Sequence, residues 1–266
     1  MMREIMVELV AEGIPFDEDG NHIRCFPHVV NIAVQTALKY LSNTSFDPAV
    51  VDPFADELAS PQELQDNTDY RTTLEADVVM SARQLVAACR ASGQRRDNFA
   101  KTIREGNVLG SWGEEGDPLR DVTLLRDMEI RWSSTYLMID RVLELAPAID
   151  EFLHKEKQQE SRITYLTLKP IELEVLADIH KFLQIPHVVQ ELVSAEKTPT
   201  LSLVLPMYEQ LIGMLRDLKF ELPKLGHAIE AASIKLDEYM GKTRKTPMHV
   251  FAMGKFLVLV LSSNYI

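Results

Sequence analysis

Apolar side chains recur at helical spacing through the second half of this chain, and proline or glycine interrupts them at intervals. The pattern predicts helices over residues 132–157, 170–194, 201–219, 222–240 and 247–261, with breaks such as "KTPT" and "MGKTRKTP". A further helical stretch is expected from Ala76 to about Arg104, broken near Gly93. No strand pattern of any length follows Phe26, so the fold is expected to be mainly α-helical.

The first 42 residues combine several element types. A helix is expected over "MMREIMVELVAEG", with Gly13 as its stop, and Asp17 to Asn21 has the composition of a turn. A short strand is predicted from His22 to Phe26, followed by a helix from Pro27. Even a two-stranded hairpin is marginal in water, so the partners of a single strand must lie outside this chain or come from another one.

Two stretches lack a sustained period and are expected to be irregular connections. Residues 43–69 form an acidic linker rich in Pro, Asp and Ser, and residues 106–118 form a second link.

Charge and cysteine content narrow the function classes. The 266 residues carry a formal charge of −12, which excludes a surface that wraps nucleic acid throughout and leaves only local DNA contacts. The basic stretches "RRDNFAKTIR" and "GKTRK" are either such contacts or solvated helix faces, and we favour the second interpretation. Two cysteines favour a reducing compartment, and no apolar run is long enough to span a membrane.

Cys25 and His28 stand three positions apart at the expected start of a helix. A structural zinc site needs four ligands, and the other cysteine and histidines are scattered, so a buried Cys and a hydrogen-bonded His is the favoured interpretation. No hydrolase elbow, phosphate-binding loop or His-Glu-x-x-His motif is present.

Arg131 and Trp132 precede an expected helix whose N-cap is Ser133, Ser134 or Thr135. The pair can brace a loop, or it can offer a stacking face and a charge to an unstacked base. On physical grounds alone, packing is favoured, because a Trp beside a helix cap commonly serves packing.

Three separated motifs resemble the hAT superfamily of DNA transposases, in particular its fungal-type copies. They are "RCFPHVVNIAVQTALKYL", "IRWSSTYLMIDRVLELAPAI" and "KFLQIPHVVQELVSAEKTPTLSLVLPMYEQLIGML". The resemblance implies an RNase H-like core interrupted by a helical insertion. Residues 1–42 would be an incomplete remnant of that α/β core, 43–69 the linker and 70–261 the insertion. It also implies that Cys25 and His28 lie beside the active site and contact bound DNA. It implies the same DNA-binding role for Arg131 and Trp132, with the Trp stacking on a flipped base.

The resemblance further implies Mg²⁺-dependent cleavage by two Asp and one Glu. None of these three positions has a counterpart in residues 1–266, so we expect no enzymatic activity, no catalytic residues and no cofactor or metal. We also expect that the zinc-binding and dimerisation regions of the family are missing. The expected function is that of a truncated transposase remnant with at most residual binding to DNA ends or to a protein.

Three alternatives stay open at this point. The chain is a domesticated interaction module that regulates full-length transposase, a clipped gene model of an active enzyme, or a plain helical scaffold. The expected partners are transposon ends, full-length transposase or another protein, with no membrane. The resemblance alone implies a nuclear location; otherwise it would be cytoplasmic.

Overall fold

The described part of the chain is mainly helical. The computed structural model describes residues 2–17, 22–42, 60–112, 117–128, 131–158, 166–194, 201–249 and 251–254, and no strand occurs in these ranges. The chain divides into two compact units: Met1–Tyr40 with Gln184–Ile266, and Leu41–Leu183. The boundary falls inside one continuous helix, α8 (Pro170–Val193).

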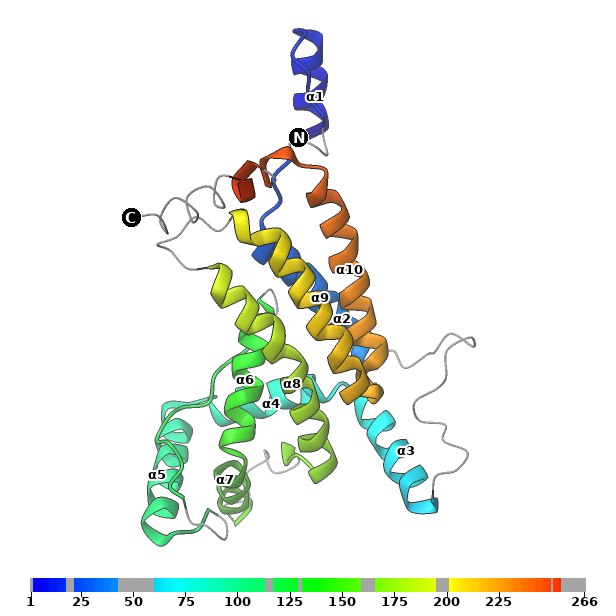
Figure 1. Ribbon diagram of the computed structural model, residues 1–266. Helices are drawn as coiled ribbons and strands as arrows, with labels where there is room; N and C mark the ends of the chain where they lie inside the picture. Colours follow the sequence, from blue (N-terminus) through cyan, green and yellow to red (C-terminus); the bar gives the residue numbers. More distant parts are fainter. Residues whose placement is uncertain are drawn as a thin grey trace, which may run out of the picture. The chain divides into compact units, whose positions relative to one another are not determined.

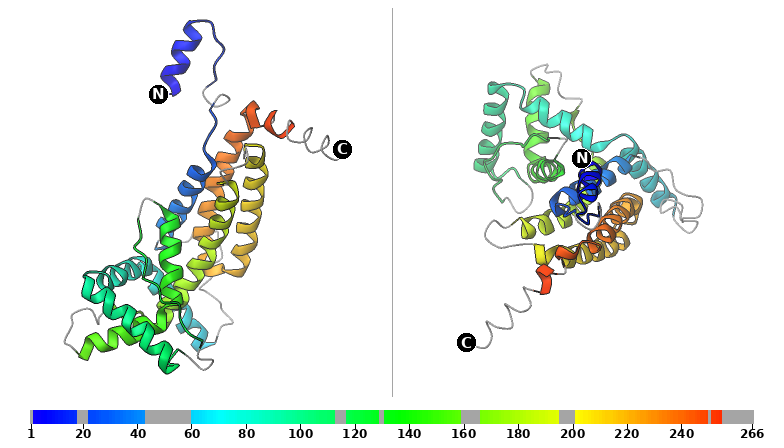
Figure 2. Two further views of the ribbon diagram at one scale, coloured as in Figure 1. Left: turned by 90° about the vertical axis from the view of Figure 1, so that its left-hand side faces the viewer. Right: turned by 90° about the horizontal axis from the view of Figure 1, so that it is seen from above.

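The first unit is built on helices α2 (Phe26–Leu41), α9 (Val204–Glu221) and α10 (Gly226–Arg244), which lie side by side (Figures 1 and 2). Phe26 of α2 meets the ring of Tyr208 on α9 edge-on, with centroids 4.8 Å apart. The His227 ring on α10 lies 2.9 Å from the Tyr40 carbonyl oxygen. Short 3₁₀ turns, Leu201–Leu203 and Pro223–Leu225, precede α9 and α10.

Helix α1 (Met2–Ala11) ends where the sequence predicted. Gly13 adopts a left-handed φ of 76°, and the Ile14 amide reaches back to the Leu9 carbonyl at 2.9 Å. Glycine is suited to this position because it has no Cβ to clash. In α1, Ile5 and Val10 are exposed, and Met6 and Leu9 are half-buried.

The second unit contains α3 (Pro61–Glu75), α4 (Val78–Cys89), α5 (Gly93–Leu109), α6 (Trp132–Glu144), α7 (Ala146–Gln158) and the first part of α8. Helix α5 packs on α7, where the Phe99 and Phe152 rings meet edge-to-face at 5.5 Å. Helix α3 is tied to α8 by the buried Tyr70 hydroxyl, which donates to Asp178 Oδ2 at 2.7 Å.

Local capping explains several helix boundaries in this unit. Ser60 and Glu63 form a reciprocal capping box, with Pro61 as the first helical residue of α3. Ser92 caps α5 by accepting from the Arg95 amide, and Gly110 ends that helix with a left-handed φ of 64°.

The structure corrects several sequence predictions. The strand expected from His22 to Phe26 is wrong: residues 22–25 are irregular and α2 begins at Phe26. A strand needs neighbours for its backbone groups, and the described residues provide none. For the same reason the α/β core remnant expected in residues 1–42 is not seen in the part of the chain that is described, where helices α1 and α2 stand instead.

Other differences concern boundaries. Helix α3 begins at Pro61, inside the range predicted as an irregular linker, of which residues 43–59 lie outside the described residues. The single helix predicted over 132–157 is two helices that meet at Leu145. Of the helix predicted over 247–261, residues 247–249 and 251–254 are helical, and residue 250 and the remainder lie outside the described ranges. No described helix combines the length and apolarity that crossing a bilayer requires.

Candidate functional site

Cys25 and His28 flank the first residues of α2 in the first unit, and both side chains are exposed. The prediction of a buried Cys25 is therefore wrong; Phe26 is the residue of this junction that enters the core. The Cys25 carbonyl accepts from the Val29 amide at 3.1 Å and so starts the helix. Nowhere among the described residues do three or more His, Cys, Asp or Glu side chains gather as metal ligands would.

Arg131 and Trp132 begin α6 in the second unit, and their environments differ. The Arg131 side chain is exposed, whereas the Trp132 indole is only 1% exposed. A base cannot stack on an indole whose faces are already covered by protein. In this conformation the arrangement fits the packing interpretation, and Arg131 alone is accessible to a ligand.

The N-cap predicted at Ser133, Ser134 or Thr135 is replaced by a polar cluster around Asp127. Arg131 occupies the N-cap position without a side-chain hydrogen bond. The Ser134 hydroxyl donates to Asp127 Oδ1 at 2.7 Å and accepts from the Met128 amide at 2.7 Å. The Thr135 hydroxyl lies 3.0 Å from the same carboxylate oxygen. These bonds hold the chain before α6 against its first turn.

Arg83 on α4 completes this cluster. Its Nε donates to Asp127 Oδ2 at 2.5 Å, and the Asp127 side chain is only 3% exposed. A carboxylate this deeply buried needs a cation and hydroxyl donors to offset its lost hydration. Asp127 carries no signal in the sequence, because its partner Arg83 lies 44 positions away and no local motif marks the pair.

Residues 117–128, which we call the strap, run as irregular chain between α5 and α6 and are held by side chains of three helices. Arg90, just after α4, donates to the Leu124 carbonyl, and Arg141 on α6 donates to the Thr123 carbonyl at 2.9 Å. Asn107 on α5 bonds both the carbonyl and the amide of Leu119, at 2.8 and 2.9 Å. These side chains thereby satisfy backbone groups of the strap that no helix or sheet ladder pairs.

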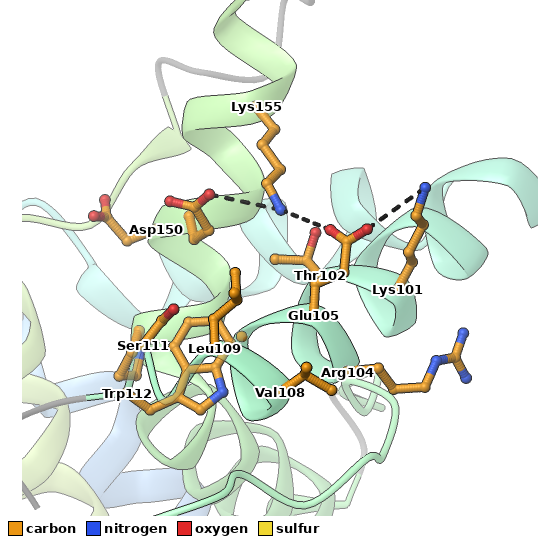
Figure 3. A pocket seen from close by; sticks show the side chains of 13 residues that line it. Lys101, Thr102, Arg104, Glu105, Val108, Leu109, Ser111, Trp112, Asp150 and Lys155 are labelled. Carbon is orange, nitrogen blue, oxygen red and sulfur yellow. Dashed lines mark hydrogen bonds and ion pairs between the residues drawn. The ribbon is translucent and has the colours of Figure 1, made fainter. Parts of the chain in front are cut away.

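A groove of about 870 Å³ lies between α5 and α7 (Figure 3). Trp112 forms one wall: its Nε1 donates to Asn107 Oδ1 at 2.7 Å and its ring lies directly on Gly106. A Cβ added at Gly106 would stand 1.8 Å from Trp112 Cζ2, so only glycine permits this approach. Val108 and Leu109 line the same groove and are 87% and 77% exposed.

Most of the charged side chains that line this groove form ion pairs. Lys155 on α7 lies 3.1 Å from Glu105 and 3.6 Å from Glu151, and Lys101 lies 3.6 Å from Glu105. The hydrogen bond from Lys155 is the main reason that the pKa of Glu105 is lowered. Arg104 is paired with Asp121 at 3.3 Å. The groove therefore presents a wall of apolar and aromatic surface beside mutually neutralised charges.

A second pocket of about 640 Å³ lies between α7 and the start of α8, lined mostly by apolar residues such as Ile149, Leu153 and Leu173. Among the described residues, the charged ones that line it are Asp150 and Lys169. It lacks the aromatic wall and the exposed rim of the α5–α7 groove.

Comparison with known proteins bears on the second unit. Residues 65–182 match the family model of the ZBED1 RNase-like helical domain. No curated protein matches the chain, and no solved structure does. The matched segment contains Arg131, Trp132, the strap and the α5–α7 groove, whereas Cys25 and His28 lie outside it. The helical region that holds Arg131, Trp132 and the α5–α7 groove is thus similar to the ZBED1 RNase-like helical domain.

Proposed function

We propose that this chain is a transposase-derived helical binding module that acts through a protein partner and not by catalysis. Its binding surface is the α5–α7 groove, and its ligand is a short protein segment with a large apolar side chain. The observation that carries the proposal is the combination of a groove of about 870 Å³ with Val108 and Leu109 left exposed at its edge.

Apolar burial supplies the affinity in this proposal. Contact with exposed apolar surface contributes roughly 25 cal/mol per Å² removed from water. Two adjacent aliphatic side chains and the Trp112 ring offer such surface at one place, next to a hollow that an anchoring side chain can enter. Contiguous exposed apolar surface beside a cavity is the usual mark of a protein-binding site.

The charges of the groove favour protein over nucleic acid. Phosphate binding draws its free energy from lysines and arginines that are available to replace counterions. Lys101, Arg104 and Lys155 are already engaged by carboxylates, and the whole chain carries a formal charge of −12. A polyanion approaching this groove would meet no excess of positive charge.

The non-catalytic part of the proposal rests on the sequence motifs. The acidic residues that the hAT resemblance requires for Mg²⁺ have no counterpart in residues 1–266, so we propose neither an enzymatic step nor a cofactor. By the same resemblance we propose a nuclear location, with full-length transposase as the first partner to test.

A peptide selection tests the groove. A displayed peptide library is selected on the full chain, and the recovered peptides are titrated while Trp112 fluorescence is followed. We expect peptides with a large apolar residue, and at least a tenfold weaker affinity for Leu109→Glu. Phe220→Glu is the matched control, because Phe220 is an equally exposed apolar residue in the first unit, at 85%. Equal affinity for both variants, or peptides without an apolar anchor, would contradict the proposal.

Binding to a DNA end is the second candidate, and the position of Arg131 favours it. This exposed guanidinium opens α6 within the segment that matches the transposase-derived domain. The test is a mobility shift of hairpin and single-stranded DNA at low and physiological salt, with Arg131→Ala and Trp132→Phe. A shift lost in Arg131→Ala supports this function, and the absence of any shift at low salt removes it.

A further inference from the structure

A group of arginines lies at the corner between α4 and α5. These arginines do not line the α5–α7 groove and are not part of the proposed peptide-binding surface. Arg90 follows the last residue of α4, Arg96 lies in the first turn of α5, and Arg126 belongs to the strap. Arg90 and Arg96 line a small hollow of about 50 Å³. We infer that this arginine corner, defined by Arg90, Arg96 and Arg126, binds a single phosphate monoester dianion.

The fold fixes the position of Arg90 at the base of the corner. One nitrogen, Nη1, donates to the Leu124 carbonyl of the strap, two residues before Arg126. Its Nε is buried and makes no hydrogen bond to the protein. A buried N–H without an acceptor is unfavourable, and an anion in the hollow would provide one.

The positive charges of Arg126 and Arg96 both act on the Arg90 guanidinium. Burial is the main cause that lowers the pKa of Arg90, followed by the positive charges of Arg126 and Arg96. Both of these side chains are exposed, and within the described ranges neither forms an ion pair. Asp121 also lines the hollow, but it is paired with Arg104 at 3.3 Å.

The start of α5 adds to this positive potential. No acidic residue stands in its first turn, where Arg95 and Arg96 lie at the positive end of the helix dipole. Cations at that end are unfavourable, whereas an anion is stabilised there. The Arg95 side chain turns back to the Ala88 carbonyl at 3.1 Å and leaves Arg96 on the side of the hollow.

Size and charge select the ligand class. A hollow of about 50 Å³ favours one small anion over a nucleobase. Guanidinium forks match phosphate oxygens in geometry and form charge-assisted hydrogen bonds with them. A long polyanion would also meet the acidic remainder of the chain, with its formal charge of −12. Free phosphate and a phosphorylated side chain share the chemistry that the corner recognises.

Calorimetric titration of the full chain tests the inference, with inorganic phosphate and a phosphoserine peptide as separate probes. We expect saturable binding of one equivalent, weakened at least tenfold in the double variant Arg96→Gln, Arg126→Gln. The matched control is Lys235→Gln, Arg244→Gln, which removes the same charge from α10, where both cations are already paired. Tighter binding of the peptide than of phosphate would identify a modified protein as the source.

The outcomes that overturn the inference are equally specific. The first is the absence of saturable phosphate binding, and the second is an equal loss of phosphate affinity in both double variants. The third is binding of DNA whose affinity falls with salt more steeply than one phosphate contact would produce. Circular dichroism verifies folding, and Arg96→Lys with Arg126→Lys keeps the charge while it removes the forks, so intermediate affinity is expected. The hollow shares no lining residue with the α5–α7 groove, so peptide selection can fail while phosphate binding holds.

Discussion

Replacing Trp132 by alanine should destabilise the second unit strongly. The indole is only 1% exposed, and a buried Trp removes about 150–250 Å² from water. At about 25 cal/mol per Å² this corresponds to about 4–6 kcal/mol, as an upper estimate. Measured Trp→Ala and Phe→Ala changes in cores fall at about 3–5 kcal/mol, which we take as the expected loss in the free energy of unfolding. A loss of this size is a large fraction of the stability of an ordinary domain.

Trp112→Ala is the matched comparison, because Trp112 is half-buried at the wall of the groove and donates one hydrogen bond. We expect a loss of about 1–2 kcal/mol for this variant, from one hydrogen bond and partial burial. Urea denaturation followed by circular dichroism gives both values. The chain has two tryptophans, so Trp112→Phe leaves Trp132 as the sole indole fluorophore. Its emission should be blue-shifted and shielded from acrylamide.

The burial of Trp132 is contradicted if Trp132→Ala changes the free energy of unfolding by less than about 0.5 kcal/mol, as surface substitutions do. The burial of Trp132 is also contradicted if acrylamide quenches its fluorescence as efficiently as that of a free indole. Either result would mean that the ring is open to solvent, and base stacking would again be the better interpretation. The urea denaturation is also the control for the DNA mobility-shift experiment, because a variant in which the second unit is unfolded cannot report on base stacking.

Three further substitutions test other features of the structure. Asp127→Ala leaves Arg83 without its partner and should cost about 1.5–3 kcal/mol in urea denaturation, and a loss under about 0.5 kcal/mol would refute the cluster's role. Gly106→Ala should displace the Trp112 ring and shift its fluorescence, because the new Cβ has no room; an unchanged spectrum would contradict the contact. The pKa of Glu238 is lowered to about 2 by hydrogen bonds from two lysines on α10. The stabilisation should therefore be full above the ordinary carboxyl pKa of 4.5 and lost as pH falls through about 2, so the melting temperatures of wild type and Glu238→Gln should converge there.

Periodicity was sufficient to place the long helices. Helix α8 was predicted over 170–194 and is observed at Pro170–Val193, since its apolar stripe is long and Pro170 suits a first helical turn. Helix α10 was predicted from residue 222 but begins at Gly226, because residues 223–225 form a 3₁₀ turn. Such a turn places side chains almost as an α-helix does, so the apolar pattern alone cannot separate the two.

Proline was a less reliable guide to helix boundaries. Pro147 stands second in α7 and marks the break at Leu145 that separates α7 from α6. Pro186 lies inside α8, and that helix continues to Val193. A proline removes one backbone donor and strains the turn before it. Whether the helix restarts or continues depends on how its faces pack, which the local sequence does not contain.

The candidate sites depended still more on long-range contacts. Arg131 and Trp132 are adjacent in sequence, yet one is exposed and the other buried. The irregular link predicted over 106–118 contains Trp112, and only its contact with Gly106 turns the end of α5 into a groove wall. Residue type indicated which side chains can bind, whereas burial and pairing decided which of them are available.

Pairing also separates the two proposed ligands. Most arginines and lysines named above, such as Arg83, Arg104 and Lys155, are matched by a carboxylate within 4.0 Å. Because these cations are already paired, binding at the groove depends on apolar contact. Binding driven by positive charge is then expected only at the arginine corner. The two sites share no lining residue, so Leu109→Glu should weaken the selected peptides alone, and Arg96→Gln with Arg126→Gln should weaken phosphate alone. If the arginine variants also weakened the peptides, one ligand would span both sites along α5, and the acidic or phosphorylated residue of that ligand would have to lie at the N-terminal end of the helix.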